Sequence, residues 1–434
     1  MDCDRKDLRV LYTVDATLSE VPESDQALGW CQEFLTPEQF AFLGDRPQLH
    51  RMWGLYWDEQ VAQPANTVSV IAYEYLIMLM RWHFHGVRGF GCLRITAFAW
   101  EDLRDLVLTQ HTSKMIDLFD RYHFVVLTDY TIDLRDGRVK WEHRTQDVDR
   151  FVQRIKHIAS STLAVCWPSP EQARAMRKLH LIKKLDTIAA NNTLSKRPWT
   201  REASGSHRRL PGEHEVGKME GSEEGSGVIL PGASEKRASE VWGPYEGKPF
   251  KYFLQQYAPL LPRLEYRVFV SGMRVLGVVK TAPVPNQSVS QRLREHIQDG
   301  HPDPTNFGSH NGGTPEERDR NIRESQRFVL QTHQELLRLV RQEVQPSTKL
   351  TLPACARYDI SIFESDGKLD YFVNEIEWTP RMGLWYYERA NLDEFLAVVD
   401  AFAASIWDLC ATTPELRERW IDHLLAIDIH SLYH

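Results

Sequence analysis

The chain has 434 residues, 42% hydrophobic and 26% charged, a balance typical of a globular protein with room for two or three domains. Its formal net charge of −8 at pH 7 argues against broad electrostatic binding of nucleic acid, although a local basic groove is compatible with it. Its 6 cysteines include no Cys-x-x-Cys pair, which favours free thiols over a disulfide framework or a zinc site.

The N-terminus and the apolar runs predict a cytoplasmic protein without membrane association. The first residues, MDCDRKDLRV, are too charged for a secretory signal. The longest apolar stretch, Val68–Met80, is shorter than a membrane span and contains Glu74. We therefore interpret it as a buried helix.

Residues 1–167 are expected to form an N-terminal α/β domain. Aromatic side chains are dense in residues 1–120, where they indicate core or domain-interface packing. Farther on, His123–Leu127 and Leu163–Trp167 read as buried strands, and Asp147–Ser160 between them has helical spacing. Strand, helix and strand in this order favour an open α/β layer.

Residues 168–285 are expected to form a small lobe. Ser169 is a candidate cap and Pro170 a first helical residue, and the helix is expected to run on to Ile188. Residues 195–240 are rich in Gly, Ser, Glu, Arg and Pro, which predicts a mobile insertion containing one short strand at Val228–Leu230.

Three further strands are predicted before residue 285. Lys251–Tyr257 is followed by Glu265–Val270 and Arg274–Lys280, and the last two are separated by Ser-Gly-Met, which is typical of a hairpin. A C-terminal lobe over 286–434 is then predicted from a long helix at Glu316–Val344, a second hairpin and two closing helices at Asn391–Cys410 and Pro414–Ile427.

The second hairpin carries the most informative polar pattern. Its strands are Arg357–Phe363 and Leu369–Ile376, joined at Asp-Gly. Alternation places Arg357 and Asp359 on one face of the first strand, and Glu375 and Glu377 on one face of the second.

If those two faces coincide, the hairpin brings three carboxylates and one guanidinium to one end of a sheet. Such a cluster of carboxylates predicts a hard cation such as Mg²⁺. The alternative is an exposed strand pair with ordinary surface acids, in which Arg357 and Asp359 form a local ion pair.

The order of elements resembles that of the ATP-grasp superfamily over roughly residues 160–390. The stretches EYRVFVSGMRVLGVVKT and ARYDISIF…DGKLDYFVNEIEW carry the resemblance. It implies an α+β, two-lobed fold that binds ATP and Mg²⁺ between its lobes. The implied activity is phosphorylation of a carboxylate, followed by attack of an amine or thiol on the acyl phosphate.

The resemblance also implies roles for individual residues. ATP would be bound by Lys184 (with Lys183 as the alternative), the hinge residues Gln255, Gln256 and Tyr257, and Glu265. Catalytic roles fall to Arg357, Lys280 and Arg267. The metal acids would be Asp359, Glu375 and Glu377, with Glu377 at a position where the family usually has Asn.

One departure from the family pattern keeps two other functions open. The family's lysine on the lobe strand is expected near Val228–Pro231, where this chain has Val-Ile-Leu-Pro, and Lys236 is the nearest substitute. The first reading is a ligase acting on a small-molecule or amino-acid substrate. The second is an amide-forming enzyme that takes an activated donor from aminoacyl-tRNA, and the third is a non-catalytic ligand-binding protein.

Overall fold

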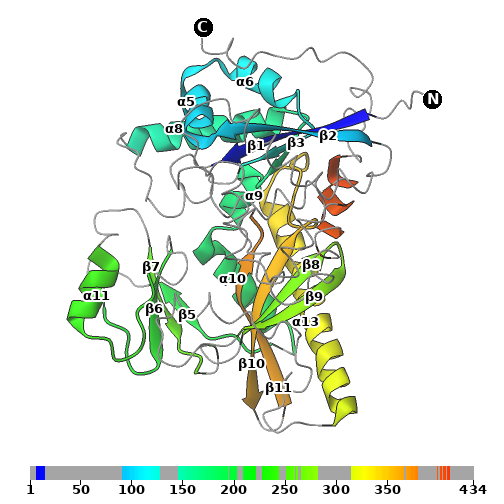
Figure 1. The fold of residues 1–434 in the computed structure, drawn as a ribbon. Coiled ribbons are helices and arrows are strands. Elements are labelled where there is room, and N and C mark those ends of the chain that lie inside the picture. Colours follow the sequence, from blue (N-terminus) through cyan, green and yellow to red (C-terminus); the bar gives the residue numbers. More distant parts are fainter. Residues whose placement is uncertain are drawn as a thin grey trace, which may run out of the picture.

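The computed structural model describes residues 6–14, 90–127, 145–193, 195–202, 209–220, 227–243, 251–259, 261, 265–281, 314–365, 368–379, 398, 401–402, 404–406 and 408–410. The closing helix expected at Pro414–Ile427 and the Asp366-Gly367 turn lie outside these residues. Within them, helices combine with three separate sheets, which confirms the predicted α+β class (Figure 1).

The N-terminal sheet is parallel, with strand order β2-β1-β3-β4. Its strands are β1 (Lys6–Val14), β2 (Phe90–Ala99), β3 (Phe124–Val126) and β4 (Val165–Trp167), and it is accompanied by α5 (Trp100–Thr109), α6 (Thr112–Phe119) and α8 (Thr145–Ser161). The strands β3 and β4 and the helix α8 match the predicted elements. Strands β1 and β2 were not recognised in residues 1–120.

Two helices replace the single one expected after Ser169. They are α9 (Pro170–Ala175) and α10 (Lys178–Ala190). Pro170 opens α9, as predicted, but the Ser169 side chain makes no capping hydrogen bond. The break arises because Arg177 has an extended backbone, with ψ 141°, so the apolar positions on its two sides belong to helices with different axes.

The three-stranded sheet, called the small sheet below, has antiparallel order β5-β7-β6. It consists of β5 (Thr200–Glu202), β6 (Glu215–Met219) and β7 (Tyr252–Gln256), and α11 (Glu235–Trp242) packs on one face. The described residues of 195–240 therefore include β5, β6 and most of α11, while 203–208 and 221–226, which also belong to the predicted mobile insertion, lie outside the described residues. Val228–Leu230 contributes only an isolated bridge from Ile229 to Gly217.

The small sheet folds although residues 195–240 are poor in apolar side chains. Met219, Ile229 and Trp242 supply apolar surface that is buried against Tyr252 and Leu254 of β7. Gly217 is required where β6 passes under this cluster, because a Cβ there would collide with Tyr252 and Trp242. The apolar cluster of the small sheet is thus complete only with β7, which begins some 30 residues after the end of β6.

The four-stranded sheet, called the large sheet below, has antiparallel order β11-β10-β8-β9. Its strands are β8 (Glu265–Ser271), β9 (Arg274–Thr281), β10 (Ala356–Ser365) and β11 (Lys368–Glu377), and α13 (Pro315–Glu343) covers one face. Both predicted hairpins and the long helix are confirmed. Strand β8 pairs with β10, and β9 pairs with β8, so both belong to this sheet, whereas the predicted boundary at residue 285 places them with the small lobe.

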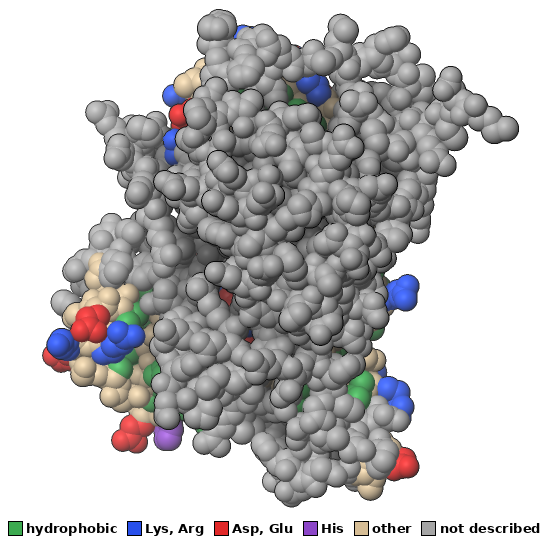
Figure 2. All heavy atoms as spheres, viewed as in Figure 1, with side chains coloured by type: hydrophobic (Ala, Val, Ile, Leu, Met, Phe, Trp, Pro, Cys, Tyr) green, Lys and Arg blue, Asp and Glu red, His purple; other side chains and the backbone are tan. Residues whose placement is uncertain are grey.

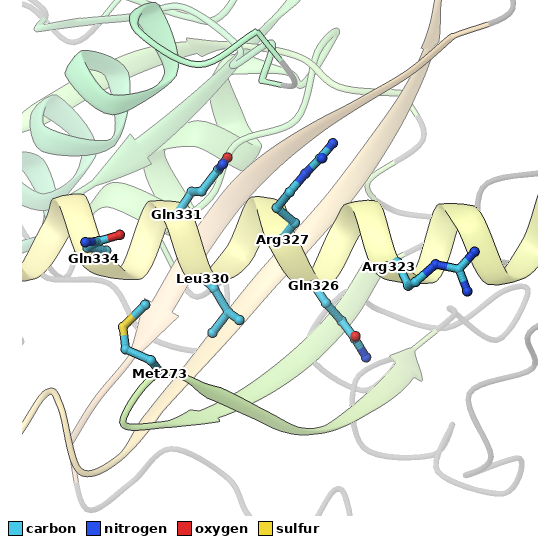
Figure 3. A pocket seen from close by; sticks show the side chains of 7 residues that line it. All are labelled: Met273, Arg323, Gln326, Arg327, Leu330, Gln331 and Gln334. Atoms are coloured by element: carbon cyan, nitrogen blue, oxygen red, sulfur yellow. The ribbon is translucent and has the colours of Figure 1, made fainter.

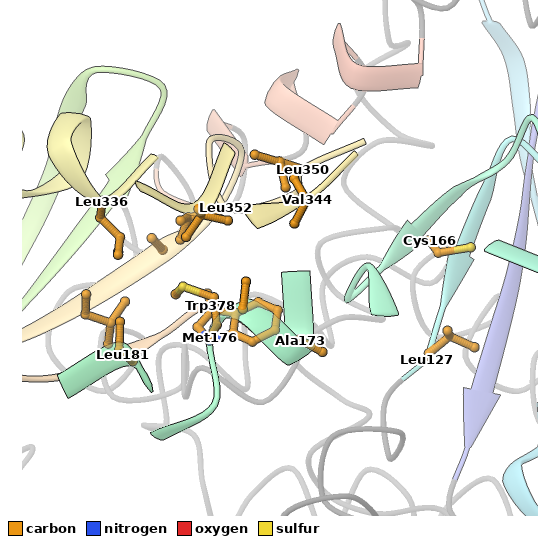
Figure 4. Packing of buried hydrophobic residues seen from close by; sticks show 14 of the residues in the cluster. Leu127, Cys166, Ala173, Met176, Leu181, Leu336, Val344, Leu350, Leu352 and Trp378 are labelled. Carbon is orange, nitrogen blue, oxygen red and sulfur yellow. The ribbon is translucent and has the colours of Figure 1, made fainter. Parts of the chain in front are cut away.

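The main core joins the large sheet to α9, α10 and α13 (Figure 4). Leu336 of α13 and Leu181 of α10 both belong to this cluster, and Trp378 is fully buried in it. Trp167 Nε1 donates to the Trp378 carbonyl at 3.0 Å, which ties the end of β4 to the residue that follows β11. In the described residues, no helix is both long and apolar enough to span a bilayer.

Candidate active site

The strand register brings the predicted polar residues of the large sheet onto one face. Arg357 lies opposite Glu377, and Asp359 lies opposite Glu375 on one side and Arg267 on the other. Directly opposed residues of antiparallel strands project to the same face, so the condition set by the sequence is met. We call this surface the site face; its charged residues are Glu265, Arg267, Arg357, Asp359, Glu375 and Glu377.

A buried ion pair forms the centre of the site face. Arg357 Nε donates to Asp359 Oδ1 at 2.7 Å and Nη2 donates to Oδ2 at 2.8 Å, a two-pronged contact. Arg267 Nε lies 4.0 Å from the same carboxylate, and all three side chains are buried. Removing one member of such a pair leaves an uncompensated charge out of water.

A β-bulge shapes the acidic end of the site face. Asp359 pairs with Glu375, but the next residue, Ile360, pairs with Val373, so Asn374 is the extra residue of β11. Asn374 Nδ2 donates to Glu265 Oε1 at 3.1 Å. Burial raises the pKa of Glu265 to about 7, with the negative charge of Asp359 adding to the shift and Arg267 opposing it.

The lysine of α10 that reaches the site face is Lys178. Its Nζ lies 3.6 Å from Glu375 Oε1. Lys184 instead is buried and donates to the Ala175 carbonyl and to Glu343, each at 2.9 Å, while Lys183 pairs with Glu202. Positions 178 and 184 are six residues apart, about 120° around the helix, so they face different neighbours.

A second lysine comes from the small sheet and corrects the sequence interpretation. Lys218 Nζ on β6 donates to Gln255 Oε1 at 2.7 Å. Burial lowers its pKa to about 8, the charge of Lys178 lowers it further, and Glu375 and Glu265 oppose the shift. Lys218 is therefore within electrostatic reach of the site face, so the small sheet does carry a lysine, on β6 and not near Val228–Pro231.

The predicted hinge residues make their contacts inside the protein. The backbone N–H of Gln256 donates to Trp199 O at 2.9 Å, and that of Tyr257 donates to His214 O at 2.8 Å. The side chain of Gln255 accepts from Lys218 and donates to Thr200. Gln255 thus orients Lys218, and the two backbone N–H groups are already used in this conformation.

Lys280 occupies the position in β9 that lies opposite Tyr266. Glu265 and Arg267 have Thr281 and Val279 as their partners. The side chain of Lys280 lies outside the described part of the structure, so its catalytic role stays a prediction.

Two carboxylates of the site face, Glu375 and Glu377, suit a hard cation, whereas the sequence predicted a set of three that included Asp359. In the described part of the chain, no three His, Cys, Asp or Glu side chains are grouped as a metal site, and Asp359 gives both oxygens to Arg357. Glu375 and Glu377 are only partly buried and share the site face. Mg²⁺ in nucleotide sites commonly takes one or two carboxylates plus phosphates and waters, and this pair fits that requirement.

Two hollows lie away from the site face. One of about 340 Å³ is bounded by Met273 of the β8–β9 turn and by α13 side chains (Figure 3). The other, about 550 Å³, lies between the end of α10 and α13. Both are lined mainly by Gln, Asn, Thr and Arg, and neither contains a residue of the site face. On the outer surface near α11, charged side chains of both signs are mixed (Figure 2).

No protein-family model matches the sequence, and no curated protein is similar to it in sequence. Solved structures are similar in shape. D-cycloserine synthetase DcsG gives a TM-score of 0.48 at 13% identity, covering 92% of this chain and 99% of that one. The fold resembles that of ATP-grasp ligases.

Two further solved structures are also similar to this chain in shape, at low sequence identity. D-alanine–D-alanine ligase from Bacillus anthracis, complexed with ATP, gives a TM-score of 0.44 at 10% identity and covers 96% of this chain and 100% of its own. The ATP-grasp ligase PsnB, with Mg, ADP and a precursor variant, gives 0.42 at 13% identity and covers 76% and 95%. These likenesses concern shape alone, so function is argued below from the site.

Proposed function

We propose that the protein is an ATP-dependent carboxylate–amine ligase of the ATP-grasp type, acting on a small molecule, an amino acid or a peptide. The carrying observation is that Lys178 and Lys218, from two separate elements, converge on the site face that holds Arg357 and Asp359. Cations that come from two separate elements suit a triphosphate, and the acids of the site face suit the accompanying Mg²⁺.

The two lysines would hold the phosphates of ATP. Lys218 is fixed by Gln255 and Lys178 by Glu375, so each ammonium group is oriented before a nucleotide arrives. Such pre-organised charges stabilise a developing negative charge without a further cost of reorganisation. Glu375 and Glu377 would hold Mg²⁺, which, when bound, neutralises charge on the β- and γ-phosphates.

Arg357 and Arg267 would face the group being transferred. A substrate carboxylate oxygen attacks the γ-phosphorus, the bond to the bridging oxygen breaks, and ADP leaves with that electron pair. An amine nitrogen then attacks the acyl carbon, phosphate departs with the C–O pair, and the amine loses one proton. The two buried guanidiniums would stabilise the negative charge on the phosphoryl group during its transfer and on the acyl phosphate. Asp359 holds Arg357 in place for this role.

Asp359 therefore has a different proposed role from the one expected of it. Its two oxygens are committed to Arg357, so it serves to orient the arginine that meets the phosphoryl group. This follows the general pattern in which a charged catalytic side chain is fixed by a buried partner.

The acceptor pocket is expected where the N-terminal domain meets β11. Trp167, the last residue of β4, donates to the carbonyl of Trp378, which directly follows Glu377. Ligands of open α/β sheets bind beyond the carboxyl ends of the strands, and β4 ends here. The end of β4 would thus lie next to the reacting groups.

The second reading, with aminoacyl-tRNA as an activated donor, was motivated by the apparent loss of the lobe lysine. Lys218 removes that motive, and the two readings differ in a simple assay. Purified protein is incubated with Mg-ATP and a panel of amino acids, and ADP and coupled products are measured. ADP formation that depends on an amino acid supports the ligase. Product formed without ATP but with charged tRNA would replace it.

A further inference from the structure

Residues 195–197 connect α10 to β5 and run beside β11, the edge strand of the large sheet. Ser195 forms a parallel bridge with Tyr371, and the Lys196 N–H donates to the Tyr371 carbonyl at 3.1 Å. In a parallel pair, the next donor would be the N–H of residue 198 and the next acceptor the Val373 carbonyl. Residue 198 is proline, which has no N–H to give.

The side chain of Arg197 reaches the acceptor that Pro198 cannot serve. Its Nη1 donates to the Val373 carbonyl, and its Nε donates to Asp186 Oδ1 of α10 at 2.7 Å. The Arg197 side chain is only 5% exposed. We infer that Arg197 is a positioning residue: it replaces the missing backbone donor and so fixes the start of the small sheet against β11.

The contact of Arg197 with the Val373 carbonyl, called the anchor below, lies between the site face and the small sheet that carries Lys218. Val373 directly precedes the bulge residue Asn374, which contacts Glu265, and Glu375 follows. At the other end, Pro198 leads into β5 and the small sheet that carries Lys218. The positive charge of Arg197 also acts on Lys218, where it contributes to the lowered pKa. Loss of the anchor would let Lys218 shift relative to Glu375.

Four variants separate the anchor from other roles of Arg197. Arg197→Gln removes the charged donor. The double variant Arg197→Gln with Pro198→Ala restores a backbone N–H opposite Val373 without restoring the charge. Pro198→Ala alone controls for the loss of proline. Asp186→Asn weakens the ion pair but leaves the Arg197 donor in place.

Hydrogen exchange of the Lys196 amide reads the anchor directly. We expect exchange at least about tenfold faster in Arg197→Gln, because a hydrogen bond to a charged group is lost next to it. The double variant should return close to the wild-type rate. Pro198→Ala and Asp186→Asn should also stay close to it.

Turnover and the titration of Lys218 give the second readout. A misplacement on the order of 1 Å can lower turnover about 100-fold, so ADP formation should fall about 10- to 100-fold in Arg197→Gln and recover in the double variant. This part rests on the proposed function. The Lys218 pKa, followed by NMR of labelled lysine, should be higher than wild type in both, because both lack the charge.

The inference is overturned if Arg197→Gln exchanges like wild type, if the double variant exchanges as fast as Arg197→Gln, or if both fail to fold. A variant that folds only when Pro198→Ala is added supports it. If the exchange results are as expected but wild-type protein makes no ADP under any condition, the anchor stands and the proposed ligase function is contradicted.

Discussion

Asp359 accepts two hydrogen bonds from Arg357, at 2.7 and 2.8 Å, from a neighbour two residues away on the same face of β10. Arg267 approaches the same carboxylate from β8. A single buried anion thus lies between two buried cations at the centre of the site face.

Asp359→Asn should therefore destabilise the protein and abolish turnover together. The change leaves Arg357 and Arg267 buried without their shared carboxylate, at a cost of about 3–5 kcal/mol in unfolding free energy. Chemical denaturation measures the loss. An unfolding free energy within about 0.5 kcal/mol of wild type would show that the two arginines do not depend on this carboxylate.

Glu375→Gln is the matched test of the proposed metal acid. Glu375 is 40% exposed on its side chain and its partner Lys178 is also partly exposed, so its stability effect should stay within about 1 kcal/mol. ADP formation should nevertheless fall steeply, and raising the Mg²⁺ concentration should recover part of it. Turnover equal to wild type would remove Glu375 from the metal site.

Glu265 should make stability fall with rising pH. Its pKa is about 7 in the folded protein against an ordinary 4.5, so the native state binds the proton more tightly than the unfolded state. Its contribution is fully present below about pH 4.5 and is lost as pH rises through about 7. At about 1.4 kcal/mol per pKa unit, the difference of about 2.5 between the two pKa values makes the full loss roughly 3–4 kcal/mol.

Glu265→Gln does not titrate, so its unfolding free energy relative to wild type should increase between pH 5 and pH 8. Denaturation curves at both pH values measure this difference, with the exposed Glu240→Gln as the control variant. A difference that is independent of pH would contradict the raised pKa.

Lys218 should take up a proton when a nucleotide binds. With a pKa of about 8 in the free protein, it is half neutral at pH 8, and phosphate oxygens nearby favour its charged form. Calorimetry in buffers with different ionisation enthalpies counts the proton. Uptake should vanish at pH 6.5, and also in Lys218→Arg, because arginine stays charged. Uptake that persists in this variant would place the titrating group elsewhere.

Particular residues show which parts of this structure could be predicted from sequence. The hairpins β8–β9 and β10–β11 were recognisable because alternation and a turn signal lie within 20 residues of each other. The register set by the turn, continued without interruption, would pair Asp359 with Asn374, so that Glu375 and Glu377 reach the face of Arg357 and Asp359 only through the bulge. The bulge at Asn374 was not foreseeable, because no local residue pattern marks it.

Lys218 and Lys178 were missed for two different reasons. Lys218 lies on a five-residue strand inside a polar segment, and its strand is held by β7 and α11, which are distant in sequence. The short run Glu215–Met219, flanked by glycines, was the only local signal. For α10, amphipathic spacing predicted a helix, but the choice among Lys178, Lys183 and Lys184 depends on which neighbours pack on each side of it.

The most direct test of the central claim is a calorimetric titration of the full chain with Mg-ATP. We predict binding to wild type, and an affinity about tenfold or more weaker in Lys178→Met and in Lys218→Met, because each loses a charged contact to phosphate. Lys236→Met, exposed on α11, should bind like wild type. No binding to wild type, or equal binding in all variants, would contradict a nucleotide site between the small sheet and the site face.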